Sequence, residues 1–218
     1  MTDPIKLIGN VASPYTRKMV AYLRYKRIPY EVIWGQPEDV LKKMNIEPPK
    51  PILLPVFILD RDGQATAVTD STPLIREFEE KYPDRSVLPR DPALNFINFI
   101  LEDFGDEWCT KFMFHYRWHF DEDADNAGTI LPLGINSALT DDELAFFKEH
   151  FAKRQIDRLW VVGSNNDTAE FIDKSYKNVL SIFEEHFKKY PFLLGSYPSS
   201  CDFAVYGQFT QLVGFDPT

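Results

Sequence analysis

The chain has 218 residues, of which 44% are hydrophobic and 26% are charged, a balance typical of folded globular domains. Its formal net charge of -9 disfavours a broad nucleic-acid-binding surface, because phosphate recognition needs clustered positive charge. No apolar run approaches the ~20 residues of a membrane span, and the first residues show no basic segment followed by an apolar one. We therefore expect a cytoplasmic protein of one large or two small domains.

The two cysteines, Cys109 and Cys201, lie far apart and in neither a C-x-x-C nor a zinc-ligand spacing. This disfavours a disulfide scaffold, a structural zinc site and a dithiol redox motif. We expect both thiols to be small buried apolar groups.

The first 83 residues alternate strand and helix signals. An Asp-Gly pair at 62–63 between two apolar runs predicts a β-hairpin. The predicted elements are, in chain order, a strand at 5–8, a helix at 14–27, a strand at 30–34, a short helix at 37–45, strands at 56–59 and 65–68, and a helix at 72–82. This β-α-β-α-β-β-α order is that of a thioredoxin-like α/β domain, in which helices cover one shared sheet.

Beyond this domain every strong signal is helical. Three prolines between 83 and 92 interrupt regular structure, so we place a linker at 84–92 and an all-helical domain at 93–218. Acidic residues at 121–126, prolonged by glycines and a proline, predict a loop. The predicted helices are 93–120, one that starts at a Thr140–Glu143 capping box, one from about 168 to 190, and one from about 200 to 213.

The turn at residues 13–18, Ser-Pro-Tyr-Thr-Arg-Lys, follows the first strand and begins a helix. Ser13 is a good N-cap and Pro14 a good first helical residue. The free N–H groups and the positive dipole end of such a helix favour an anion, which could be a thiolate. On local grounds alone an ordinary N-cap explains this stretch better, because Ser-Pro is a common helix start.

Two further segments fall at the same edge of the domain. A cis Leu54–Pro55 bond would turn the Leu54 backbone outward, where it could pair with a bound peptide, whereas a trans proline could simply start a strand. Asp70 and Ser71 precede the third predicted helix, where they suit a ligand ammonium and carboxylate, although they could serve only as caps. Together the three segments predict a groove for a zwitterionic peptide whose sulfur points at Ser13.

These motifs, in this order, resemble those of the cytosolic glutathione S-transferases, in a serine-type, bacterial-like and uncharacterised subgroup. The resemblance includes the Asp-Ser-Thr-Pro run that starts at Asp70, and Phe-Leu-Leu-Gly at 192–195 followed by Ser199 and Asp202, which is similar to the capping box and buried Asp of the family's sixth helix.

The resemblance implies a transferase that uses glutathione as co-substrate and needs no metal. Ser13 would donate a hydrogen bond to the glutathione thiolate, with Tyr15 and Thr16 as alternative donors. Glutathione would be held by Leu54, Pro55, Asp70, Ser71 and Lys50. It also implies an apolar electrophile as second substrate, and a homodimer formed by the third helix and the helix from Ala93.

The absence of a cysteine at position 13 argues against glutaredoxin-like or dehydroascorbate-reductase-like chemistry, which needs a protein thiolate. The alternative function is a glutathione-transferase-like binding or interaction module with little catalysis. The run at 48–55, Pro-Pro-Lys-Pro-Ile-Leu-Leu-Pro, favours it, since the family usually has glycine and valine there.

The chain departs from the usual pattern of the family at two places in the helical domain. The stretch 121–139 is longer than expected between two helices, and the sequence given ends about sixteen residues after Asp202, where the family normally continues. We therefore expect a helical domain that is incomplete at its C-terminus, with Val205, Phe209 and Leu212 unusually exposed.

His115 and His119, at i and i+4, could form a metal-ligating pair. An aromatic-rich helix that faces the other domain, a second subunit or the electrophile pocket explains them better, because no third ligand follows at motif spacing.

Overall fold

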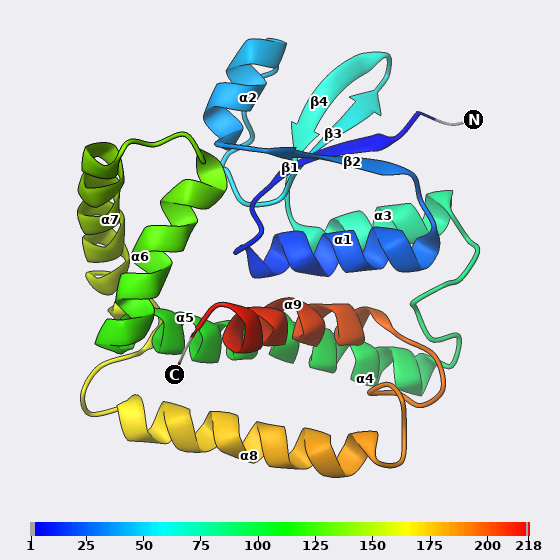
Figure 1. The fold of residues 1–218 in the computed structure, drawn as a ribbon. Coiled ribbons are helices and arrows are strands. Elements are labelled where there is room, and N and C mark those ends of the chain that lie inside the picture. Colours follow the sequence, from blue (N-terminus) through cyan, green and yellow to red (C-terminus); the bar gives the residue numbers. More distant parts are fainter. Residues whose placement is uncertain (1–2, 217) are drawn as a thin grey trace.

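The structure is a computed structural model, which describes residues 3–216 and 218. The N-terminal part of the chain forms a four-stranded sheet (Figure 1). Met1, Thr2 and Pro217, which belong to the terminal segments considered above, lie outside the described residues. In the sheet order β2-β1-β3-β4, β1 and β2 are parallel and the other pairs antiparallel. The elements are β1 (Ile5–Gly9), α1 (Pro14–Lys26), β2 (Tyr30–Trp34), α2 (Pro37–Met44), β3 (Val56–Arg61), β4 (Gln64–Val68) and α3 (Ser71–Lys81). The predicted thioredoxin-like βαβαββα order is confirmed.

The two faces of the sheet pack against different helices (Figure 1). Leu7 and Phe57 are buried against α1 and α3. Their strand neighbours Ile8 and Val56 are buried with Leu41 of α2 on the opposite face. This alternation follows from the period of two along a strand, and it leaves α1 and α3 between the sheet and the rest of the molecule.

The remainder of the chain is helical, as predicted. It comprises α4 (Pro92–Asp103), a π-helical turn η1 (Phe104–Trp108), α5 (Cys109–His119), α6 (Asp121–Ile135), α7 (Asp141–Ile156), a 3-10 turn η2 (Leu159–Val162), α8 (Ala169–Phe187) and α9 (Ser200–Gly214). Figure 1 shows α9 next to α1, with α8 on the far side of α9. Across residues 3–216, every helix is too short or too polar to cross a bilayer.

The expectation of a loop at 121–126 and beyond is wrong, because residues 121–135 form α6. Three acidic residues in its first turn suit the positive end of the helix dipole. Gly128 allows α7 to approach closely, since a Cβ there would lie 3.1 Å from Lys148 Cγ. Packing against α7 therefore sustains a helix that contains Pro132.

The expected exposure of α9 is also wrong. Val205 and Leu212 are buried, and the Phe209 ring packs against Tyr176 and Phe183 of α8. The long helix α8 thus supplies the cover that we expected from later helices.

Several local predictions are confirmed. Thr140 and Glu143 form a capping box at the start of α7. Ser199 and Asp202 form another at α9, where the Asp202 carboxylate also accepts the Leu193 N–H at 2.8 Å. Cys109 and Cys201 are both fully buried free thiols.

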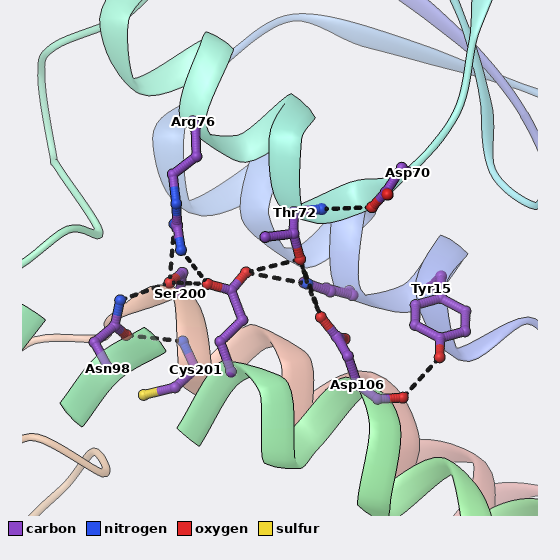
Figure 2. Close-up of polar contacts among 10 residues, drawn as sticks. Tyr15, Asp70, Thr72, Arg76, Asn98, Asp106, Ser200 and Cys201 are labelled. Carbon is purple, nitrogen blue, oxygen red and sulfur yellow. Dashed lines mark hydrogen bonds and ion pairs between the residues drawn. The ribbon is translucent and has the colours of Figure 1, made fainter. Parts of the chain in front are cut away.

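A buried ionic cluster joins the two parts of the chain, and we call it the Lys18 network (Figure 2). Lys18 of α1 is 1% exposed, and its Nζ lies 2.6 Å from Asp106 Oδ2 and 3.2 Å from Glu102 Oε1. Arg76 of α3 pairs with the other Glu102 oxygen at 2.6 Å, and the Thr72 hydroxyl bridges both carboxylates. Two helices of the sheet domain are thereby bound to α4 and η1.

Neutral groups extend the Lys18 network to α9. The Ser200 hydroxyl donates to Glu102 at 2.7 Å and accepts from the Asn98 amide at 2.8 Å. Burial would raise the pKa of Glu102, but Lys18 and Arg76 outweigh it and hold that pKa below its usual range. For Asp106 burial prevails over Lys18, and its pKa is raised. Glu102 is thus the carboxylate that is firmly ionised.

Two glycines allow α9 to pack closely on its neighbours. A Cβ on Gly207 would lie 2.5 Å from the Pro14 carbonyl oxygen, and one on Gly105 would lie 2.8 Å from the Ala204 Cβ. The first turn of α1 therefore rests directly on the backbone of α9.

We predict that Lys18→Met destabilises the protein by about 3–5 kcal/mol, because it leaves buried carboxylate charge uncompensated. Urea unfolding followed by tryptophan fluorescence measures the change. Lys153→Met is the matched control, since the Lys153–Asp157 pair is exposed and should contribute about 0.5 kcal/mol or less. Adding Asp106→Asn to Lys18→Met should restore part of the loss. Equal, small effects at positions 18 and 153 would contradict this account.

We also predict that Gly207→Ala destabilises the protein by about 1–3 kcal/mol, since the new methyl group must push α1 away from α9. The same substitution at Gly214, where a Cβ would meet no neighbouring atom, is the control. It should leave stability within about 1 kcal/mol of the parent. Thermal unfolding of the two variants side by side makes the comparison, and equal melting temperatures would show that the contact at Pro14 is loose.

Candidate functional site

The C-terminal end of β1 and the start of β3 meet at one edge of the sheet, because these strands are antiparallel neighbours. Ser13 follows β1, Leu54 precedes β3, and both line a cavity of about 260 Å³, here called the Ser13 cavity. Asn10, Ala12 and Gln36 complete its wall on the sheet side. The opposite wall comes from α5, α6 and α7, and consists of Met113, Phe114, Arg117, Trp118, Leu131, Ile135, Phe151 and Gln155. The site therefore lies between the two domains.

Ser13 is the N-cap of α1, with extended backbone angles of φ -87° and ψ 119°. Its Oγ accepts the Thr16 N–H at 3.2 Å. This cap uses a lone pair of the hydroxyl and leaves the proton free to donate toward the cavity. The structural role of Ser13 as an N-cap therefore does not exclude a role as hydrogen-bond donor.

The alternative donors point elsewhere. The Tyr15 hydroxyl donates to the Asp106 carbonyl at 2.7 Å, as Figure 2 shows, and burial raises its pKa to about 12. Thr16 is 1% exposed, and its hydroxyl accepts the Asn10 N–H at 3.4 Å. Neither residue lines the Ser13 cavity.

Of the two alternatives at Leu54–Pro55 the structure has the cis bond, and it has a second cis bond at Lys50–Pro51. Within residues 3–216, neither the N–H nor the carbonyl of Leu54 has a backbone hydrogen-bond partner. Pro55 is buried, whereas Lys50 is exposed and does not reach the cavity lining. The cavity edge is thus built around Leu54.

Asp70 and Ser71 lie at the start of α3, outside the lining of the Ser13 cavity. The Asp70 carboxylate caps the helix through the Thr72 N–H at 3.2 Å (Figure 2). Its φ of 79° is one that residues with a side chain rarely adopt. A strained backbone conformation such as that of Asp70 often accompanies a binding site. Ser71, the next residue, is buried at 8% exposure.

The His115–His119 pair lies in the helical core. His115 is fully buried, its Nδ1 lies 2.7 Å from the Ser164 hydroxyl, and its ring stacks on His119 at 4.5 Å. Burial, and then the nearby His119, lowers the pKa of His115 to about 4. Among the described residues, no group of three or more His, Cys, Asp or Glu side chains is placed to hold a metal ion.

Sequence reasoning missed four polar residues of the cavity: Asn10, Gln36, Arg117 and Gln155. Asn10 directly follows β1, so its place at the strand end was a usable signal. Arg117 lies on α5 between the two histidines that drew attention, and only the packing of α5 against the sheet domain reveals its position. Of the aromatic residues on this helix, Phe114 and Trp118 line the cavity, whereas Phe112 and Tyr116 lie in the helical core.

A second cavity of about 310 Å³, the outer cavity, adjoins the first and shares Gln36, Ile135 and Phe151 with it. Its remaining lining residues are Asp39, Pro132, Asn136, Leu139 and Phe147. The two cavities therefore form one cleft, whose outer wall is the α6–α7 pair.

A thioredoxin-like domain followed by an all-helical region, with a mostly apolar cleft between them, defines the class of protein. Residues 7–86 match the family model of the glutathione S-transferase N-terminal domain. The chain thus carries a glutathione S-transferase N-terminal domain within a glutathione S-transferase fold. A search of curated protein sequences finds no match.

Solved structures share this fold over nearly the whole chain. Beta-etherase LigF from Sphingobium sp. strain SYK-6 is 21% identical, with a TM-score of 0.62 over 96% of this chain and 84% of that one. FzlA from C. crescentus is 16% identical, with a TM-score of 0.60 over 99% and 81%. A glutathione S-transferase from Methylobacterium radiotolerans, solved with glutathione sulfonate, is 20% identical, with a TM-score of 0.57 over 99% and 82%. At these identities the comparison establishes the fold.

Proposed function

We propose that this protein is a glutathione S-transferase that activates the glutathione thiol for attack on an apolar electrophile. One observation carries the proposal. The Ser13 hydroxyl at the start of α1 and the Leu54 backbone, which has no backbone hydrogen-bond partner among the described residues, line the same cavity. A donor for a sulfur and a pairing edge for a peptide are thereby brought together.

The chemistry follows from the position of Ser13. A free thiol has a pKa of ~8.5 and is mostly protonated at neutral pH. A hydrogen bond from the Ser13 hydroxyl and the free N–H groups of α1 stabilise the thiolate and lower that pKa. The thiolate then attacks an electrophilic carbon, and its electron pair forms the new carbon–sulfur bond as the leaving group departs. Ser13 remains a donor throughout and forms no covalent bond.

The remaining binding residues follow from the same placement of the tripeptide. The cis Leu54–Pro55 bond orients the Leu54 backbone, which pairs with the cysteinyl segment of glutathione. Asp70 receives the ammonium and Ser71 the carboxylate of the γ-glutamyl end. Lys50 is the candidate for the glycyl carboxylate, although its exposed position makes it the least constrained of the set.

The electrophile occupies the outer cavity and the aromatic wall of the Ser13 cavity. Phe114, Trp118 and Phe151 present apolar surface there, and Phe147 continues it outward. Burying apolar substrate surface against these rings is favourable at about 25 cal/mol per Å². An extended aromatic or alkyl electrophile fits this cleft better than a compact polar one.

The rival function, a binding module with little catalysis, uses the same groove without the chemical step. The second cis-proline and the glycine-free run before Leu54 are the features that favour it. Retention on immobilised glutathione without thiol conjugation would identify this function.

We predict that Ser13→Ala and Ser13→Gly both lower the conjugation rate about 10²-fold, because each removes a hydrogen bond of ~2–3 kcal/mol to the thiolate. Glutathione affinity, measured by calorimetry, should change far less. Only Ser13→Ala should lose about 1 kcal/mol of stability, since glycine is an adequate N-cap. Ser13→Thr, which keeps the hydroxyl, should retain most activity. Equal activity of the parent and Ser13→Gly would reassign the donor to backbone N–H groups.

We also predict a homodimer in which α4 is buried. Phe96 and Phe99 of α4 are 64% and 56% exposed, and Leu94, Ile97 and Ile100 surround them. Light scattering should give twice the chain mass, and Phe96→Glu should yield a monomer, because a charge would be buried at the contact. Phe171→Glu on α8, where the side chain is 73% exposed, is the control and should stay dimeric. A monomeric parent protein at micromolar concentration would contradict the prediction.

A further inference from the structure

The turn that presents Ser13 is held by side chains from the helical region. The Ala12 carbonyl accepts from Arg117 Nη1 of α5 at 3.0 Å. The Val11 carbonyl accepts from Gln211 Nε2 of α9 at 3.4 Å, and from Arg17 Nε at 2.9 Å. The N–H groups of the same two peptides donate to Asn10, from Ala12 to its Oδ1 at 2.9 Å and from Ser13 to its carbonyl at 3.0 Å. Contacts within the turn therefore hold one side of these peptides, and Arg117 is the donor that holds the Ala12 carbonyl from the other domain.

Arg117 is the centre of this arrangement. It is 4% exposed, and besides Ala12 it donates to Asp216 Oδ1 from Nε at 2.9 Å and to Gln211 Oε1 from Nη2 at 3.1 Å. Three nitrogens of one planar group thus bind three acceptors in three directions. A lysine carries the same charge on a single nitrogen and cannot reproduce this geometry.

We infer that Arg117 is a positioning residue, which sets the direction of the Ser13 hydroxyl by holding the Ala12 carbonyl from across the domain boundary. This inference rests on the proposed function of Ser13 as the thiolate donor. It assigns a role to a residue that touches neither the hydroxyl nor, in the proposed placement, the sulfur.

Geometry, rather than charge, is what Arg117 contributes. Its guanidinium is the only charged group among the described residues that line the Ser13 cavity, but it is already paired with the buried carboxylate of Asp216. The pair is locally neutral, so little of the positive charge remains for a thiolate. The Ala12 carbonyl, by contrast, belongs to the peptide that links directly to Ser13.

Hydrogen–deuterium exchange tests the inference without relying on catalysis. Arg117→Lys should increase exchange in residues 10–17 about tenfold, since the turn loses its cross-domain donor. The β3–β4 hairpin should be unaffected. Gln211→Met removes the contact with the Val11 carbonyl and one acceptor of Arg117, but no charge. It should give the same exchange pattern, and it replaces Arg117→Lys in this experiment if that variant folds poorly.

The matched control is Tyr116→Phe, one residue before Arg117 on α5. The Tyr116 hydroxyl donates to the Asp173 carboxylate of α8, so its removal deletes a hydrogen bond of α5 without touching the Ser13 turn or the acceptors of Arg117. It should leave exchange in residues 10–17 as in the parent. Unchanged exchange in Arg117→Lys, or an equal increase in Tyr116→Phe, would overturn the inference.

Kinetics then link the turn to the reaction. Arg117→Lys should lower kcat about tenfold to a hundredfold with little change in the KM for glutathione, as misplacement of a reacting group does. In the Ser13→Gly background the same substitution should cost less than twofold, because Arg117 acts through Ser13. If Arg117→Lys lowered kcat in the Ser13→Gly background as much as it does in the parent, the mechanism would be refuted. If the parent conjugates no electrophile, the proposed function fails, while the exchange experiment still decides the role of Arg117.

Discussion

The buried ammonium of Lys18 is the interaction on which the arrangement of the molecule depends. An unpaired charge at 1% exposure would cost several kcal/mol, so α1 can dock on the helical region only where Glu102 and Asp106 meet it. Arg76 then compensates the second oxygen of Glu102, which also fixes α3. Because Ser13 lies just over one helical turn before Lys18, the docking of α1 also determines where the candidate donor points.

Close packing and hydrogen bonding reinforce this ionic constraint from both ends of the site. Gly207 brings the α9 backbone against Pro14, and Arg117 holds the carbonyl before Ser13. The Ser13 cavity therefore has one wall from each domain, as ligand sites at domain junctions commonly do. Neither domain alone contains a complete site. In the proposed function this arrangement separates two requirements: the sheet edge would recognise the peptide, and the helical wall would hold the molecule that reacts with it.

The success of the sequence interpretation depended on how local each signal was. The Ser13 N-cap and the Thr140–Glu143 capping box are determined by a few consecutive residues, and both were predicted. The residues around Pro55 left a cis and a trans bond as alternatives, and the structure has the cis bond. Helix α6 was not predicted, because Gly128 and Pro132 favour a loop until α7 packs against them. Arg117 was missed for a similar reason, since nothing in its neighbourhood along the chain indicates that it reaches Ala12. The cavity walls thus depend on contacts distant in sequence, whereas the individual elements do not.

The π-helical turn η1 between α4 and α5 has a consequence for how this chain can vary. A π turn holds one residue more than an α turn, so removing a single residue from Phe104–Trp108 would restore a regular helix. Because the wider turn absorbs this residue within a single turn of helix, the side chains after such a deletion would keep approximately their direction relative to α4. Arg117 would stay near Ala12, whereas the side chains within the turn, Asp106 among them, would change direction. A related chain that is one residue shorter in this segment should therefore keep the position of Arg117 but pair Lys18 differently, so the spacing between Glu102 and Arg117 distinguishes the two arrangements.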